Sequence, residues 1–120
     1  MKKKTASEEI SEISGLLCIE EELLNGIFQR FLNLEKVVLF GSRALKSNKA
    51  YSDIDFCLYG PLQTSDLLLL TNRIDDLMLP YKVDLILFNN IGSPSLIKHI
   101  ENKGKEFFKA RLFQEKPTQL

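Results

Sequence analysis

Apolar side chains recur every three or four positions in three parts of the chain, which is the spacing of a helix with one buried face. The first part spans residues 19–33. The second begins at Thr64 or Ser65, since either side chain can cap a helix N-terminus. The third begins at Ser93 and is stopped by Gly104, a residue type that favours helix C-termini. The pattern therefore predicts three helices.

Short apolar runs bounded by turn residues predict the strands between these helices. They lie at residues 36–40, 53–59 and 81–88, and residues 105–108 add an edge strand. The first two strands are separated by about a dozen residues without a long crossover helix, so they are able to pair antiparallel. We therefore expect an α/β fold with a small mixed, partly antiparallel sheet that is flanked by helices.

The length of 120 residues suits one domain with a real core. We place this domain at residues 15–108. Before it lies an N-terminal extension, residues 1–14, that we expect to be flexible. Residues 109–120 form a C-terminal tail. The two cysteines, Cys18 and Cys57, make no disulfide framework, and we expect both to be reduced thiols.

Charge and hydropathy narrow the classes of function. Sixteen basic residues balance sixteen acidic ones, so the chain lacks the basic field that strong nucleic-acid binding needs. The basic start is followed by polar residues, which argues against a signal peptide, and the apolar run at residues 67–70 is too short to span a membrane. We expect a cytoplasmic protein with no membrane contact, in which a polyanionic ligand is bound at a local site.

Two carboxylates in the second predicted strand are candidates for chemistry. Asp53 and Asp55 are two residues apart, so in a strand they point to the same face, while Ile54 points to the core. Two neighbouring carboxylates repel each other, and a divalent cation removes that repulsion. Oxygen ligands of this kind suit Mg²⁺ or Mn²⁺.

Asp84 interrupts the third predicted strand, which is otherwise apolar. A buried charge in such a strand costs several kcal/mol unless it is paired or bound to a metal. One interpretation is that Asp84 shares the cation of the acid pair. The other is a structural ion pair with Lys82, which lies on the same face of the strand.

Gly41 and Ser42 lie where the first strand ends and a helical turn begins. Glycine allows a phosphate to approach the main chain closely, and free amides at a helix start favour an anion. Arg43 either contacts a triphosphate or makes a structural ion pair. His99 is the only histidine, and we expect it at the surface. Tyr59 shares the strand face of the acids, where we expect packing rather than base stacking.

These motifs resemble a known family. Gly41-Ser42, ten intervening residues and Asp53-Ile54-Asp55 are similar to the signature of the polymerase-beta-type nucleotidyltransferases. The flanking residues closely resemble the minimal nucleotidyltransferases (MNT proteins) of prokaryotes, which are often antitoxins paired with a helical ribonuclease of the HEPN type. The resemblance covers residues 15–108, and Asp84 matches the third carboxylate of the family.

The resemblance implies a metal-dependent transfer of AMP from ATP. Asp53, Asp55 and Asp84 would hold two Mg²⁺ ions, with Mn²⁺ as a substitute, and Gly41 and Ser42 would bind the β- and γ-phosphates. The acceptor would be a tyrosine hydroxyl on a HEPN-type toxin. An antitoxin that neutralises its partner by contact alone is the alternative. A nucleotidyltransferase that modifies an antibiotic is a weaker one, since the chain has no separate substrate domain.

Overall fold

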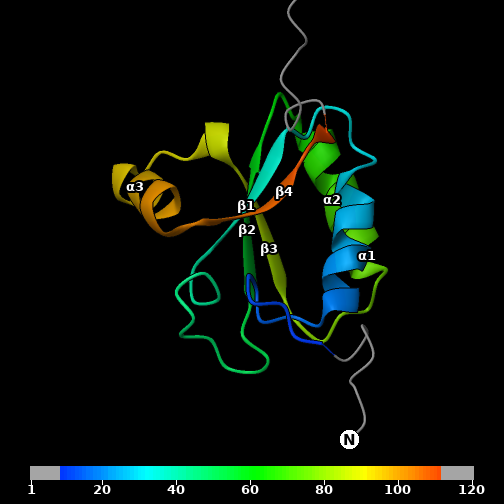
Figure 1. Cartoon of the computed structure of the whole chain (residues 1–120). Helices are drawn as coiled ribbons and strands as arrows, with labels where there is room; N and C mark the ends of the chain where they lie inside the picture. The colour runs from blue at the N-terminus through cyan, green and yellow to red at the C-terminus, as the bar shows by residue number, and fades with distance from the viewer. Residues whose placement is uncertain (1–8, 112–120) are drawn as a thin grey trace, which may run out of the picture.

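A four-stranded sheet carries the residues of interest, and the computed structural model describes residues 9–111 of the chain around it (Figure 1). The strand order is β3-β2-β1-β4. The strands are β1 (Lys36–Phe40), β2 (Ile54–Tyr59), β3 (Val83–Leu87) and β4 (Lys105–Lys109).

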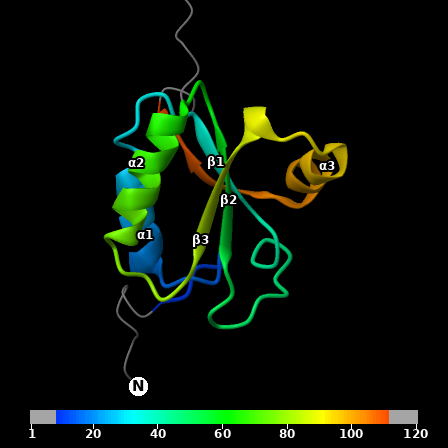
Figure 2. The same ribbon diagram turned by 180° about the vertical axis from the view of Figure 1, so that it is seen from behind.

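Helices cover both faces of this sheet (Figures 1 and 2). They are α1 (Cys18–Phe28), α2 (Thr64–Asp75) and α3 (Pro94–Lys103), with a short 3₁₀ helix η2 (Phe88–Asn90) after β3. Side chains of α1 and α2 pack together on one face, whereas Ile100 of α3 packs on the other. None of the helices in this part of the chain is long and apolar enough to cross a membrane.

The strand pairing confirms the mixed sheet expected from the sequence. β1 pairs antiparallel with both β2 and β4, and β2 pairs parallel with β3. The register places Asp55 opposite Phe40 on one side and opposite Asp84 on the other. The starts of β2 and β3 therefore lie side by side, next to the end of β1.

Alternation along β2 separates the two faces of the sheet. Ile54, Phe56 and Leu58 are buried in the core under α1 and α2, while Cys57 is buried beneath α3. The larger core is built on aromatic rings, with the ring centroids of Phe28 and Phe56 5.4 Å apart in an edge-to-face contact. Burial raises the pKa of the Cys57 thiol to about 11, so this cysteine is a protonated core residue.

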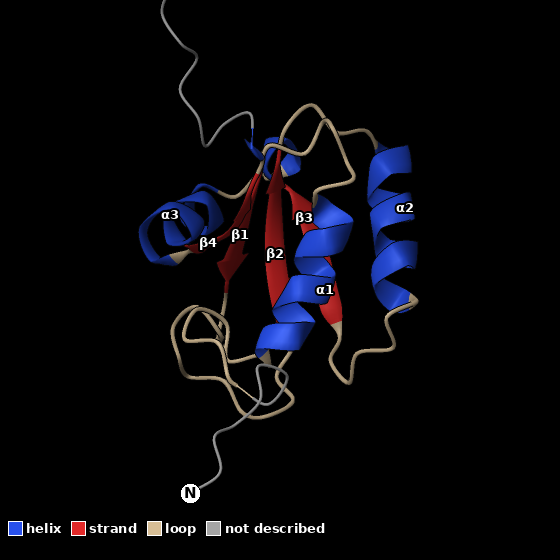
Figure 3. Ribbon diagram, turned by 45° about the vertical axis from the view of Figure 1, so that its right-hand side comes forward, coloured by secondary structure: helices blue, strands red, loops and turns tan. Residues whose placement is uncertain are grey.

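The long loop between β1 and β2, residues 41–53, lies at the end of the sheet where β1 stops and β2 starts (Figure 3). Its first turn is closed by hydrogen bonds from the Leu45 amide to the Gly41 carbonyl, 3.1 Å, and from the Ser47 amide to the Ser42 carbonyl, 3.0 Å. The helical turn expected after the first strand is therefore present.

Two helix boundaries differ from the expectation. α1 ends at Phe28, because the chain beyond it continues as turns in which the Phe31 amide bonds the Phe28 carbonyl and the Leu34 amide bonds the Phe31 carbonyl. α2 is capped one residue before Thr64, where the Gln63 amide donates to the carboxylate of Asp66 at 2.9 Å. A carboxylate in the first turn thus replaces the expected hydroxyl cap.

Part of the predicted N-terminal extension packs on the domain. Ile10 forms an isolated antiparallel bridge with Leu17, and Ser14 is buried. The remainder of that extension, residues 1–8, and most of the predicted tail, residues 112–120, lie outside the described residues.

Candidate active site

The three candidate carboxylates lie at one end of the sheet. Asp53 immediately precedes β2, and Asp55 pairs across the sheet with Asp84. Asp55 shares its strand face with Cys57, which packs under α3, so the acids belong to the α3 face of the sheet. The parallel pairing of β2 and β3 therefore brings Asp84 next to the acid pair, as the sequence interpretation required.

The electrostatics of the site are those of crowded carboxylates. Burial raises the pKa of Asp55, and the charges of Asp84 and Asp53 raise it further, whereas Lys82 acts in the opposite direction. The ionised form of Asp55 is thus disfavoured by its surroundings. A bound cation would relieve this repulsion.

Asp84 is more exposed than its apolar strand indicated. Its side chain is 43% exposed, and its Oδ1 lies 3.8 Å from Nζ of Lys82, whose side chain is 71% exposed. An ion pair this long and this exposed to solvent contributes roughly 0–1 kcal/mol to the free energy of unfolding. The expectation of a costly buried charge was therefore wrong, because β3 is an edge strand and its start stays open to solvent.

The donor chemistry of these acids fits a divalent cation. All three offer oxygen ligands, which Mg²⁺ and Mn²⁺ prefer, and burial together with the two neighbouring acids raises the pKa of Asp55. Within residues 9–111, however, no three carboxylate, imidazole or thiol groups already converge as a metal cluster. A cation would have to draw the side chains together from their adjacent positions.

Gly41 brings the main chain against this acid group. Its φ is +78°, a conformation that favours glycine, and a Cβ added to it would lie 2.4 Å from Oδ2 of Asp55. Any other residue would be strained and would displace the carboxylate. Neither the amide nor the hydroxyl of the next residue, Ser42, has a hydrogen-bond partner within the described chain. Two donors are therefore free beside the acids.

Arg43 holds the loop 41–53 together from inside. Its side chain is 2% exposed, and its guanidinium donates to the main-chain carbonyls of Ser52, Ser14 and Ala50 at 3.1, 3.0 and 3.3 Å. The Ser52 carbonyl immediately precedes Asp53. The guanidinium thus fixes the chain at the start of the acid strand, rather than forming the structural ion pair that was one of its two expected roles.

An aromatic ring and a carboxylate complete the surroundings of Arg43. The guanidinium carbon lies 4.8 Å from the ring centroid of Tyr81, and the Tyr81 hydroxyl donates to Oε1 of Glu20 at 3.0 Å. Burial lowers the pKa of Arg43, while Tyr81 and Glu20 oppose that shift. Contact with a triphosphate stays a prediction for this residue.

His99 is a residue that the sequence interpretation placed at the surface. It is half-buried, and its Nε2 accepts a hydrogen bond from the Gly41 amide at 3.3 Å. Its ring meets the ring of Phe40 edge-on, at 6.3 Å between centroids. One signal was available in the sequence, since His99 lies three residues after Leu96 and next to Ile100 on the apolar stripe of α3.

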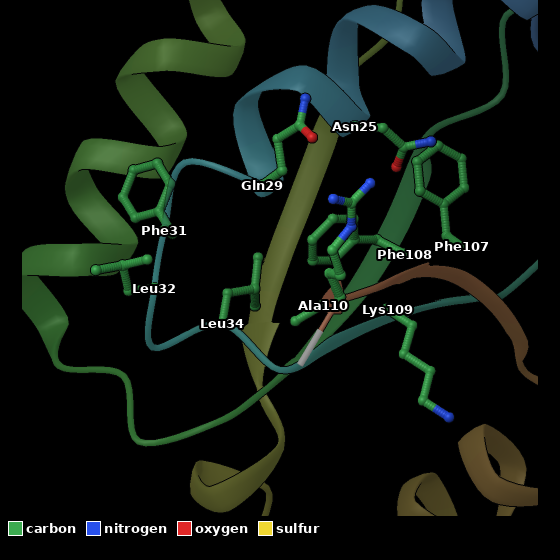
Figure 4. A pocket seen from close by; sticks show the side chains of 10 residues that line it. Asn25, Gln29, Phe31, Leu32, Leu34, Phe107, Phe108, Lys109 and Ala110 are labelled. Atoms are coloured by element: carbon green, nitrogen blue, oxygen red, sulfur yellow. The ribbon is translucent and has the colours of Figure 1, made fainter. Parts of the chain in front are cut away.

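The remaining aromatic candidate and a hollow of about 610 Å³ lie away from the acids. Tyr59 stacks on Phe88 at 4.4 Å between centroids, so it packs as expected. Figure 4 shows a hollow between the end of α1 and β4, lined in part by Asn25, Leu34 and Phe107. It lies on the face covered by α1 and contains none of the predicted site residues.

A comparison with known protein families identifies the family of the chain. The profile described as "Polymerase beta, Nucleotidyltransferase" matches residues 22–111. The chain belongs to this nucleotidyltransferase family. Two proteins of Methanocaldococcus jannaschii, both named provisionally as protein adenylyltransferases, are 35% and 39% identical to the chain over 94 residues. Each match covers 77% of this chain and 91% of the relative.

Solved structures share the nucleotidyltransferase fold. A toxin–antitoxin structure with AMP-PNP has a TM-score of 0.62 at 20% identity, over 78% of this chain and 76% of that one. A second structure is that of a tri-AMPylated Shewanella oneidensis HEPN toxin in complex with MNT antitoxin. Its TM-score is 0.58 at 18% identity, over 80% of this chain and 75% of that one. A protein of Sulfolobus solfataricus, provisionally named a nucleotidyltransferase, has a TM-score of 0.53 at 20% identity. The match covers 91% of this chain and 92% of that one. At these identities the likeness establishes the fold.

Replacing Arg43 with lysine tests the internal role of its guanidinium. Lysine keeps the charge but cannot reach three carbonyls from one planar group, so we expect a loss of roughly 2–4 kcal/mol in unfolding free energy. Urea unfolding measures this loss. The matched control is Arg30→Lys, at an exposed position, which we expect to stay within about 0.5 kcal/mol of wild type. Wild-type stability combined with lost ATP binding would instead make Arg43 a phosphate ligand.

Replacing Asp55 with asparagine tests the repulsion in the site. The pKa of Asp55 is raised on folding, so its ionisation destabilises the folded protein above that pKa and has no effect well below the ordinary value of 3.8. In metal-free buffer at neutral pH we expect Asp55→Asn to be more stable by up to about 1 kcal/mol. Thermal melts across the acid range should show this difference shrinking as pH falls. A variant less stable at neutral pH would contradict the repulsion.

Proposed function

We propose that this nucleotidyltransferase moves AMP from ATP onto a hydroxyl of a partner protein, and that it acts as the antitoxin of a toxin–antitoxin pair. The observation that carries the proposal is the placement of Asp53, Asp55 and Asp84 at one sheet end, directly against the Gly41 turn. Carboxylates for cations and free donors for phosphates thus occupy adjacent positions, as transfer from a nucleoside triphosphate requires.

The site residues divide into cation ligands and phosphate-binding groups in the proposed reaction. Asp53, Asp55 and Asp84 would hold Mg²⁺, with Mn²⁺ as a substitute, and the cation would neutralise phosphate charge and lower the pKa of the acceptor hydroxyl. The free amide and hydroxyl of Ser42 bind the β- and γ-phosphates. Gly41 takes the positive φ that leaves Ser42 beside the acids, and its missing side chain leaves room for the Asp55 carboxylate.

The chemical step is an in-line substitution at the α-phosphorus of ATP. A new bond forms between the acceptor oxygen and the α-phosphorus, the bond to the bridging oxygen breaks, and pyrophosphate leaves. The proton of the acceptor hydroxyl passes to Asp84, whose side chain is 43% exposed and whose ion pair with Lys82 is long, at 3.8 Å. Arg43 keeps the start of β2 in place while this happens.

A protein partner is favoured by charge and by the shape of the domain. The balanced charge gives little affinity for an RNA backbone. The described chain is taken up by one sheet and its covering helices, and the acids open to solvent. Among the proteins of this fold are an MNT antitoxin in complex with a tri-AMPylated HEPN toxin and a toxin–antitoxin with AMP-PNP. We therefore infer a HEPN-type toxin as the acceptor.

Intact-mass analysis of the partner tests the proposal. The purified chain, ATP and MgCl₂ are incubated with a HEPN-type toxin protein, and we expect that protein to gain one or more adenylyl groups. EDTA, Asp53→Asn or Asp55→Asn should abolish the gain. If the partner's ribonuclease activity is suppressed equally by wild type and by Asp53→Asn, with no change of mass, neutralisation by contact replaces the proposal.

Asp84→Asn separates a catalytic carboxylate from a structural ion pair. We expect the transfer rate to fall by about 10²–10⁴-fold, as for the loss of a general base, with a stability change below about 1 kcal/mol. Single-turnover assays beside thermal melts give both quantities. The matched control is Lys82→Met, which removes the same ion pair and leaves the carboxylate. If Lys82→Met slows transfer as much as Asp84→Asn, the ion pair and not the carboxylate is what the reaction needs.

A further inference from the structure

We infer that His99 of α3 is a positioning residue, which holds the Gly41 turn in the conformation that nucleotide binding requires. The inference rests on the proposed function, because it assigns His99 to the phosphate end of that site. Its direct support is the hydrogen bond from the Gly41 amide to Nε2 of His99, 3.3 Å long and made between residues 58 positions apart.

This bond acts on the Gly41 amide, while the Gly41 carbonyl is held within the loop by the Leu45 amide. Gly41 is the point where β1 ends, and glycine has the widest conformational freedom of any residue. On the next residue, the amide and hydroxyl of Ser42 have no hydrogen-bond partner within residues 9–111. The imidazole of His99 therefore adds, from α3, a side-chain restraint on the peptide between Phe40 and Gly41.

Rotation of that peptide would disturb both halves of the site. The absent Cβ of Gly41 faces Oδ2 of Asp55 at 2.4 Å, so a change of φ moves the main chain against or away from the carboxylate. The same change redirects the Ser42 amide, which is the proposed phosphate donor. His99 thus couples the positions of the phosphate-binding and carboxylate groups through the main chain of Gly41.

The hydrogen bond also sets the state of the imidazole. Nε2 accepts from Gly41, so it carries no proton, and the neutral ring bears its hydrogen on Nδ1. The edge-on contact with Phe40 holds the plane of the ring. An acceptor at the position of Nε2 is therefore the property that the role requires, and the ring itself supplies packing.

Two substitutions separate these properties. Glutamine places an amide oxygen near the position of Nε2 and keeps the acceptor, whereas leucine keeps apolar bulk and removes it. We expect His99→Leu to weaken Mg–ATP binding and to slow AMP transfer by about 10–100-fold, the scale of a small misplacement of reacting groups. We expect His99→Gln to recover most of both. Lys98→Leu, on the exposed side of α3, is the matched control and should behave as wild type.

A spectroscopic measurement on the nucleotide-free protein tests the bond independently of activity. In ¹⁵N-labelled protein the Gly41 amide proton should shift in His99→Leu and return towards the wild-type position in His99→Gln, with unchanged melting temperatures. The inference is overturned if the Gly41 signal is the same in all three proteins, or if His99→Gln loses nucleotide binding as fully as His99→Leu. If wild type itself neither binds nor transfers nucleotide, the proposed function fails, and the Gly41 signal still decides whether His99 holds the turn.

Discussion

The contact between the Gly41 main chain and the Asp55 carboxylate is the constraint on which the site depends. At this point the end of β1 and the start of β2 are paired, and a Cβ on residue 41 would lie 2.4 Å from Oδ2 of Asp55. The absence of a side chain therefore lets an acidic strand and a donor-bearing turn share one small space. The positive φ of Gly41 turns the chain away from the sheet immediately afterwards and leaves Ser42 beside the acids.

The rest of the loop depends on this contact being held from several sides. Arg43 ties the loop to the N-terminal segment through Ser14 and to the start of β2 through Ser52. His99 reaches the same turn from α3. A loop of this length between two antiparallel strands would otherwise have many conformations, and ordering it has an entropic cost. Partly buried hydrogen bonds offset that cost at the two ends where the chemistry is proposed to occur.

The sequence predicted the parts of the site that depend on local rules. Strand alternation placed Asp53 and Asp55 together, and the strand-to-turn boundary identified Gly41 and Ser42. The sequence pattern could not show that β3 is an edge strand, so the burial of Asp84 was overestimated. Strand order is a long-range property, because it depends on where a segment of the chain returns after a crossover helix rather than on the residues of the strand.

The contacts of Arg43 and His99 are also long-range properties, which the local sequence pattern did not predict. Arg43 meets carbonyl groups that any residue type would present, so no sequence pattern marks its partners. His99 was assigned to the surface because metal sites need a second ligand, yet its partner is a main-chain amide. Its position three residues after Leu96 was the informative signal, since a polar group that packing partly covers tends to find a hydrogen bond.

Arg43 and His99 matter because the carboxylates of the site lower the stability of the protein that carries them. Asp55 is held where burial and two neighbouring acids disfavour its charge, an arrangement that destabilises the protein without a cation. Such an arrangement persists only when the surrounding structure is able to hold it. Here the aromatic core beneath β2 fixes the strand, and Arg43 and His99 fix the turn that faces it. The scaffold thus keeps the repelling carboxylates at adjacent positions on β2 and β3, from which a cation with its nucleotide would draw their side chains together.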